Sequence, residues 1–171
     1  MAKPKQPCLL VILIHSARRQ WFVAAVDLDA SLIPLIRSEP DNLDRYAGRD
    51  AEEQLSFLRH RLSGAMQRGC DRLWARERKA ASIVVIASED LPGSADELLP
   101  QLAEHLHTWM TRPPVITFRG EGFDQLASLD DLDCLAGSLD DQQHSALQSA
   151  LPNLAARTIG DDWEVAQKPQ A

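Results

Sequence analysis

The feature that most constrains the fold is a set of short, almost wholly apolar runs bounded by polar residues. Cys8–Ile14 is the first, Trp21–Val26 follows it closely, and Ser82–Ala87 comes much later in the chain. Runs of this length that contain β-branched residues indicate strands buried on both faces of a sheet. The sequence therefore predicts an α/β domain built around these strands.

Two weaker runs complete the predicted sheet. Ser31–Ser38 contains Pro34, which cannot donate to a strand ladder, so this strand is expected at an edge. Because the first three runs follow one another closely, they predict an antiparallel meander. Val115–Arg119 is expected as the fifth strand, and the preceding Pro113-Pro114 favours the other edge.

Between these strands, two segments carry apolar residues at helical spacing. Asp50 and Glu53 form an Asp-x-x-Glu start that resembles a capping box. Basic residues after position 75 are expected in the last turn of this helix, where the helix dipole favours them. The apolar stripe comprises Leu55, Leu58, Leu62, Met66, Gly69 and Leu73, and the basic residues are Arg76, Arg78 and Lys79. A second helix is predicted from Ser94 to Met110.

The last third of the chain is acidic. Residues 1–119 hold 16 basic and 15 acidic side chains (+1), and residues 120–171 hold 2 and 10 (−8), which gives the total of −7. Ser-Leu-Asp-Asp occurs at Ser128 and Ser138, and each copy predicts a capping serine of a short helix, ending before Gly137 and at Pro152. The expected division is a flexible tail (1–7), an α/β domain (8–119), an acidic helical extension (120–152) packed on that domain, and a loosely docked or disordered tail (153–171).

The predicted order, β-β-β-α-β-α-β, resembles the ribonuclease H-like fold. The resemblance is one of topology over roughly residues 8–119 and a following helix, with no matching motif. It implies a mixed five-stranded sheet, with the first and fourth strands central and the third and fifth at the edges.

In nucleases of this fold, carboxylates hold two divalent metal ions. The resemblance implies one acid in the first strand and others on the first long helix and at the end of the fourth strand. Glu53, Glu89 and Asp90 match the last two positions, but Cys8–Ile14 holds no acid, and His15-Ser16 stands where an aspartate is expected. Actin-like relatives need Gly-rich phosphate loops, and residues 15–20 contain no glycine. The sequence favours a non-catalytic domain without a cofactor.

A basic stripe is predicted on the first long helix, within an arc of about 80°. It comprises Arg61, Arg68, Arg72, Arg76 and Lys79. Such a stripe can bind phosphates or carboxylates. The same pattern is typical of a solvated helix face, and it also fits a helix that binds an internal partner such as the acidic C-terminal segment.

Other chemistries find little support. Cys8, Cys70 and Cys134 are scattered, which favours free thiols over a disulfide or zinc site, and the histidines lack metal-ligand spacing. The N-terminal apolar run is too short to span a bilayer, and Arg18 and Arg19 follow it where a signal peptide would be cleaved. We expect a cytoplasmic protein.

The sequence thus predicts a non-catalytic ribonuclease H-like domain that binds another protein as an adaptor or assembly factor. Two alternatives remain. One is a metal-dependent nuclease or phosphotransferase that uses Glu53, Glu89 and Asp90, and the other is nucleic-acid binding through the basic stripe. The oligomeric state is not indicated.

Overall fold

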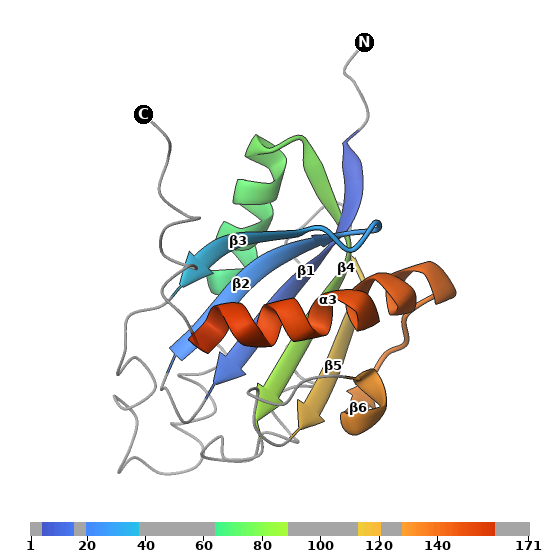
Figure 1. The fold of residues 1–171 in the computed structure, drawn as a ribbon. Helices are drawn as coiled ribbons and strands as arrows, with labels where there is room; N and C mark the ends of the chain where they lie inside the picture. Colours follow the sequence, from blue (N-terminus) through green and yellow to red (C-terminus); the bar gives the residue numbers. More distant parts are fainter. Residues whose placement is uncertain (1–4, 16–19, 38–63, 89–112, 121–127, 160–171) are drawn as a thin grey trace.

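The computed structural model describes residues 5–15, 20–37, 64–88, 113–120 and 128–159. These residues form a six-stranded sheet with a helix on each face (Figure 1). The strands are β1 (Gln6–His15), β2 (Gln20–Asp27), β3 (Leu32–Arg37), β4 (Arg78–Ser88), β5 (Val115–Gly120) and β6 (Asp133–Ala136). The predicted α/β class is confirmed.

The sheet is mixed, with the strand order β3-β2-β1-β4-β5-β6. The first three strands form the predicted antiparallel meander, and β4 pairs with β1 and β5 in parallel. Strands β1 and β4 lie in the middle because almost every side chain of their apolar runs is buried. The edge position predicted for β3 is also confirmed.

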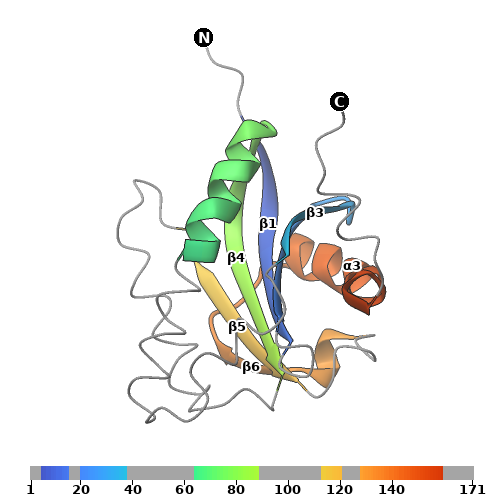
Figure 2. The same cartoon turned by 90° about the vertical axis from the view of Figure 1, so that its left-hand side faces the viewer.

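Two helices cover the two faces of the sheet (Figure 2). The helix over residues 64–75 packs through Ala65, Met66 and Leu73 on one face. Helix α3 (Asp141–Ile159) packs through Leu147, Leu151 and other apolar residues on the opposite face. Successive side chains of β1 alternate between the two cores, with Leu10 facing the first and Leu9 the second. This is why the first run is apolar without interruption.

The prediction of five strands was wrong, and so was the edge position of β5. A sixth strand, β6, pairs antiparallel with β5 and takes the edge. A helix was expected there. Ser128 does cap a turn, accepting a hydrogen bond from the Asp130 N–H (3.1 Å), but the turn is a single 3-10 turn, η4 (Leu129–Asp131). Leu129 and Leu132 are both buried, so one tight turn satisfies their spacing and the chain then extends into β6.

Helix α3 also differs from the prediction at both ends. Its cap is Asp140 rather than Ser138: Asp140 Oδ1 accepts from the Gln143 N–H (2.7 Å), and Gln143 Oε1 accepts from the Asp140 N–H (3.4 Å). The helix does not end at Pro152 but continues to Ile159, into the segment expected as a loose tail. Burial of the following residues, Leu154 among them, offsets the roughly 3 kcal/mol that an interior proline costs.

Gln143 also joins α3 to the sheet, because its Oε1 accepts from the buried Ser82 hydroxyl (3.2 Å). We predict that Gln143→Ala lowers the free energy of unfolding by about 1–2 kcal/mol, since it removes a capping bond and leaves Ser82 without this acceptor. Urea unfolding measures the loss. Gln142→Ala, at an exposed neighbouring position, is the control and should change stability by less than about 0.5 kcal/mol. Equal losses in the two variants would contradict this role.

Candidate functional site

A hollow of about 210 Å³ lies where the helix over residues 64–75 ends beside the start of β4. Among the residues that the structure describes, its lining comes from three parts of the chain: the helix, the first residues of β4, and Pro113 before β5. The lining residues are Gln67, Cys70, Asp71, Trp74, Arg78, Lys79, Ala80 and Pro113. The lining therefore combines apolar and charged groups.

Trp74 is the most unusual member of this lining. Its side chain is 59% exposed, and among the residues that the structure describes it is the only large apolar side chain at the surface. Lys5 holds it in place: the Lys5 ammonium lies 4.4 Å from the centre of the indole ring and pairs with Glu77 at 2.8 Å. Glu77 itself has a φ of 60°, an uncommon conformation for a residue other than glycine. The exposed ring is thus part of a structured helix end.

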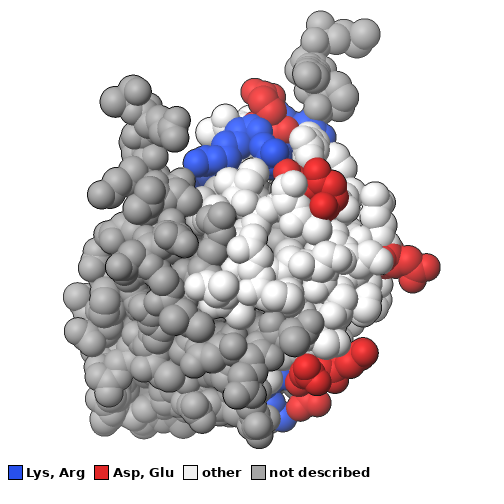
Figure 3. All heavy atoms as spheres, in the orientation of Figure 1, with Lys and Arg blue, Asp and Glu red and all other residues white. Residues whose placement is uncertain are grey.

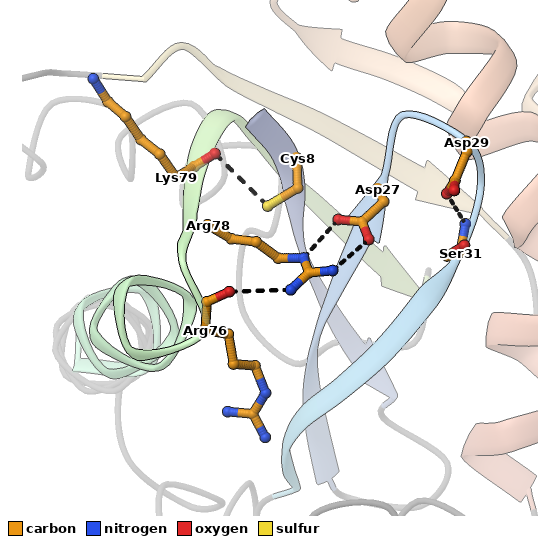
Figure 4. A network of polar contacts seen from close by, with 7 residues as sticks. All are labelled: Cys8, Asp27, Asp29, Ser31, Arg76, Arg78 and Lys79. Carbon is orange, nitrogen blue, oxygen red and sulfur yellow. Dashed lines mark hydrogen bonds and ion pairs between the residues drawn. The ribbon is translucent and has the colours of Figure 1, made fainter. Parts of the chain in front are cut away.

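A buried ion pair fixes the start of β4 (Figure 4). Arg78 reaches over β1 to Asp27, with Nε–Oδ1 and Nη2–Oδ2 distances of 2.8 and 2.9 Å, and its Nη1 donates to the Arg76 carbonyl (3.1 Å). The Asp27 side chain is only 4% exposed. Its hydrogen bonds raise the pKa of Arg78, which therefore stays charged. Two parallel charge-assisted bonds hold β2 and β4 in one relative position.

The thiols near this end are protonated at neutral pH. Burial, together with the charge of Asp27, raises the pKa of Cys8 to about 12. Burial and the charge of Asp71 raise the pKa of Cys70 to about 12 as well. Because the thiolate is the nucleophile, neither cysteine is suited to covalent catalysis.

The predicted basic stripe is not a single helix face. The helix ends at residue 75, so Arg76 lies in the following turn and Lys79 lies in β4. The Arg68 guanidinium lies 5.7 Å from the centre of the Trp21 ring, and Arg72 Nη1 donates to the Leu35 carbonyl (2.8 Å). Of the stripe, only Lys79 lines the hollow, and Arg61 lies outside the described residues.

Arg72 has a structural task. Leu35 is the extra residue of a bulge in β3, between the pairs Ala24–Pro34 and Val23–Ile36. Because of the bulge, both Leu35 and Ile36 face the core under the helix, and Arg72 binds the carbonyl of the unpaired residue.

We therefore predict that Arg72→Ala lowers the free energy of unfolding by about 1 kcal/mol. Arg76→Ala is the control and should lower it by less than about 0.5 kcal/mol, because the Arg76 side chain is exposed. Thermal or urea unfolding of both variants measures the difference. An unchanged stability of the Arg72 variant would show that the contact does not support the bulge.

The residues proposed for a metal site, Glu53, Glu89 and Asp90, lie outside the described residues. Within the described parts of the chain, no group of three or more His, Cys, Asp or Glu residues is placed to hold a metal ion. No helix there is long and apolar enough to cross a membrane.

On the face that carries α3, Lys and Arg atoms gather at the end where β1 begins, with Asp and Glu atoms beside them (Figure 3). A second acidic group lies at the end near β6, again with Lys or Arg atoms beside it. The exposed acidic residues of η4 and β6 are Asp130, Asp131 and Asp133. These three acids thus do not cover the end of the molecule where the hollow lies.

Sequence reasoning missed the main residues of this site: Lys5, Asp27, Trp74 and Arg78. Trp74 carried a usable signal, since it follows Leu73 and therefore points about 100° away from the apolar stripe. The Asp27–Arg78 pair joins residues far apart in the sequence, and no local pattern reveals it. No protein-family model, curated protein or solved structure matches the chain.

Proposed function

We propose that this chain is a non-catalytic ribonuclease H-like domain that binds another protein, as an adaptor or assembly factor in the cytoplasm. The observation that carries the binding function is the exposed Trp74 ring beside the hollow. Tryptophan is enriched among the residues that dominate protein–protein binding energy, particularly where it lies against a pocket.

The contacts that order this surface support the proposal. The Lys5–Glu77 pair and the cation–π contact hold Trp74, and the Asp27–Arg78 pair holds the strand beside it. A surface that is already ordered loses less conformational entropy when a partner binds.

The ribonuclease H-like part of the proposal is supported by the order β3-β2-β1-β4-β5, with β1, β4 and β5 parallel. The sixth strand is an addition to the five strands that this resemblance implies. Strand β1 carries no carboxylate in any of its 10 residues, and this favours binding over metal-dependent catalysis. The internal contacts of Arg68 and Arg72 make the basic stripe less suited to nucleic acid.

Affinity capture by the full chain, with variants, tests the binding function. The immobilised wild-type chain should retain a protein that Trp74→Ala retains at least tenfold less, because the anchor residue is lost. His144→Ala, at an exposed position of α3, is the matched control and should retain the same protein as the wild type. If Trp74→Ala and the wild type retain the same proteins in equal amounts, the Trp74 surface is not the binding site.

A further inference from the structure

The first residues of β4 offer an open strand edge. β4 pairs with β1 from Arg78 onward, whereas its pairing with β5 begins only at Ile83, whose N–H donates to the Pro114 carbonyl (2.9 Å). Among the residues that the structure describes, residues 78–80 thus pair on one side only, and a bulge then leaves Ala81 as an extra residue between Ala80 and Ser82. Ala80 and Ala81 are accordingly half-buried, while residues 83–87 of the same strand are fully buried.

The register of the ladder indicates which backbone groups are available. The Gln6 N–H donates to the Glu77 carbonyl (2.9 Å), and Gln6 lies opposite Arg78. In a parallel ladder, successive residues direct their N–H and C=O groups to alternate sides. The backbone groups of Arg78 and Ala80 are therefore directed away from β1, toward the open side.

The hollow lies beside this edge. Lys79 and Ala80 line it together with Cys70, Trp74 and Pro113. Its volume of about 210 Å³ suits one large apolar side chain. Pro113 and Pro114, the two described residues before β5, carry no N–H and therefore cannot donate to the open edge of β4.

We propose that an extended segment of a partner protein adds to residues 78–80 of β4 as a short strand and inserts one large apolar side chain beside Trp74. This inference rests on the proposed protein-binding function and specifies how the partner is held. Strand addition takes its affinity from main-chain hydrogen bonds and its specificity from a side-chain pocket, and the structure places both kinds of group side by side.

The charges of the hollow favour a peptide over a polyanion. The negative charge of Asp71 offsets the positive charge of Lys79 in the lining, and Asp27 neutralises Arg78. A phosphate-rich ligand would find little net positive charge here, whereas a neutral main chain with an apolar side chain matches the groups present.

A displayed library of random linear peptides, selected against the full chain, is the probe for this inference. The enriched peptides should share one large apolar residue. When titrated into the isotope-labelled full chain, they should shift the amide NMR signals of Arg78 and Ala80 and slow the exchange of both amides. Trp74→Ala should weaken these peptides at least tenfold, and Arg76→Ala, which replaces an exposed residue outside the lining, should leave their affinity unchanged.

Failure of this inference is distinguishable from failure of the proposed function. If no peptide is enriched, or if bound peptides leave the Arg78 and Ala80 amides unchanged, strand addition is wrong. A protein partner whose retention still depends on Trp74 would then preserve the binding function alone. If neither peptides nor proteins distinguish Trp74→Ala from the wild type, both fail.

Discussion

Asp27→Ala is expected to lower the free energy of unfolding by about 2–4 kcal/mol. The substitution leaves the half-buried Arg78 guanidinium without its carboxylate, and removing one partner of such a pair costs more than losing both partners. The position of the strand that lines the hollow depends on the same pair. Urea unfolding of the purified chain measures the loss.

Two companion variants separate the effect of the ion pair from simple loss of packing. Arg78→Met alone should also destabilise the chain, because it leaves the Asp27 carboxylate buried and unpaired. Asp27→Ala combined with Arg78→Met should cost less than the sum of the two single changes, since no unpaired charge remains. Strict additivity would contradict the ion pair as the source of the stability.

The chain is expected to lose stability steeply at alkaline pH. The pKa of Cys8 and that of Cys70 are raised to about 12 in the folded state, from an ordinary value of 9.0. Below pH 9 both states hold the thiol protons and the contribution to stability is complete. As the pH rises from 9 toward 12, the unfolded chain releases these protons first, so the contribution is lost. At pH 11 the loss is on the order of 3 kcal/mol per thiol.

Denaturant unfolding at pH 8 and pH 11 measures this loss. The free energy of unfolding should differ less between the two pH values in Cys70→Ala, because the contribution of one thiol is removed. Other groups that titrate in this range contribute equally in both proteins. Gln142→Ala, which replaces an exposed residue without a titrating group, is the control and should leave the pH dependence as in the wild type. A Cys70→Ala variant with the wild-type pH dependence would contradict the assigned cause.

The central sheet could be predicted from the sequence because its signals are local. A strand buried on both faces needs apolar side chains at every position, and Cys8–Ile14 has them. Pro34 likewise marks an edge, because proline lacks the N–H that a central strand donates to its neighbour. Strand β6 gave no such signal, because it is 4 residues long and is held mainly by its pairing with β5.

The candidate site could not be predicted, because it depends on contacts between distant residues. The basic residues 76, 78 and 79 suit the last turn of a helix, but Arg78 starts β4 instead, where it reaches the buried Asp27. The open edge arises from the difference in length between β4 and β5, which only their register reveals. Sequence periodicity indicates which face of a strand or helix is buried, but it does not indicate at which residue the neighbouring strand begins or ends.

Site-specific photo-crosslinking tests the central claim, that a partner protein binds at the hollow beside Trp74. Gln67 lines the hollow and Gln142 lies on α3, on the opposite face of the sheet; both are exposed glutamines. Each is replaced in turn by a photoreactive phenylalanine in the full chain, which is irradiated in cells. We expect a crosslink to a defined protein from position 67 that Trp74→Ala abolishes and that position 142 does not give. No crosslink from position 67, or the same crosslink from both positions, would contradict the claim.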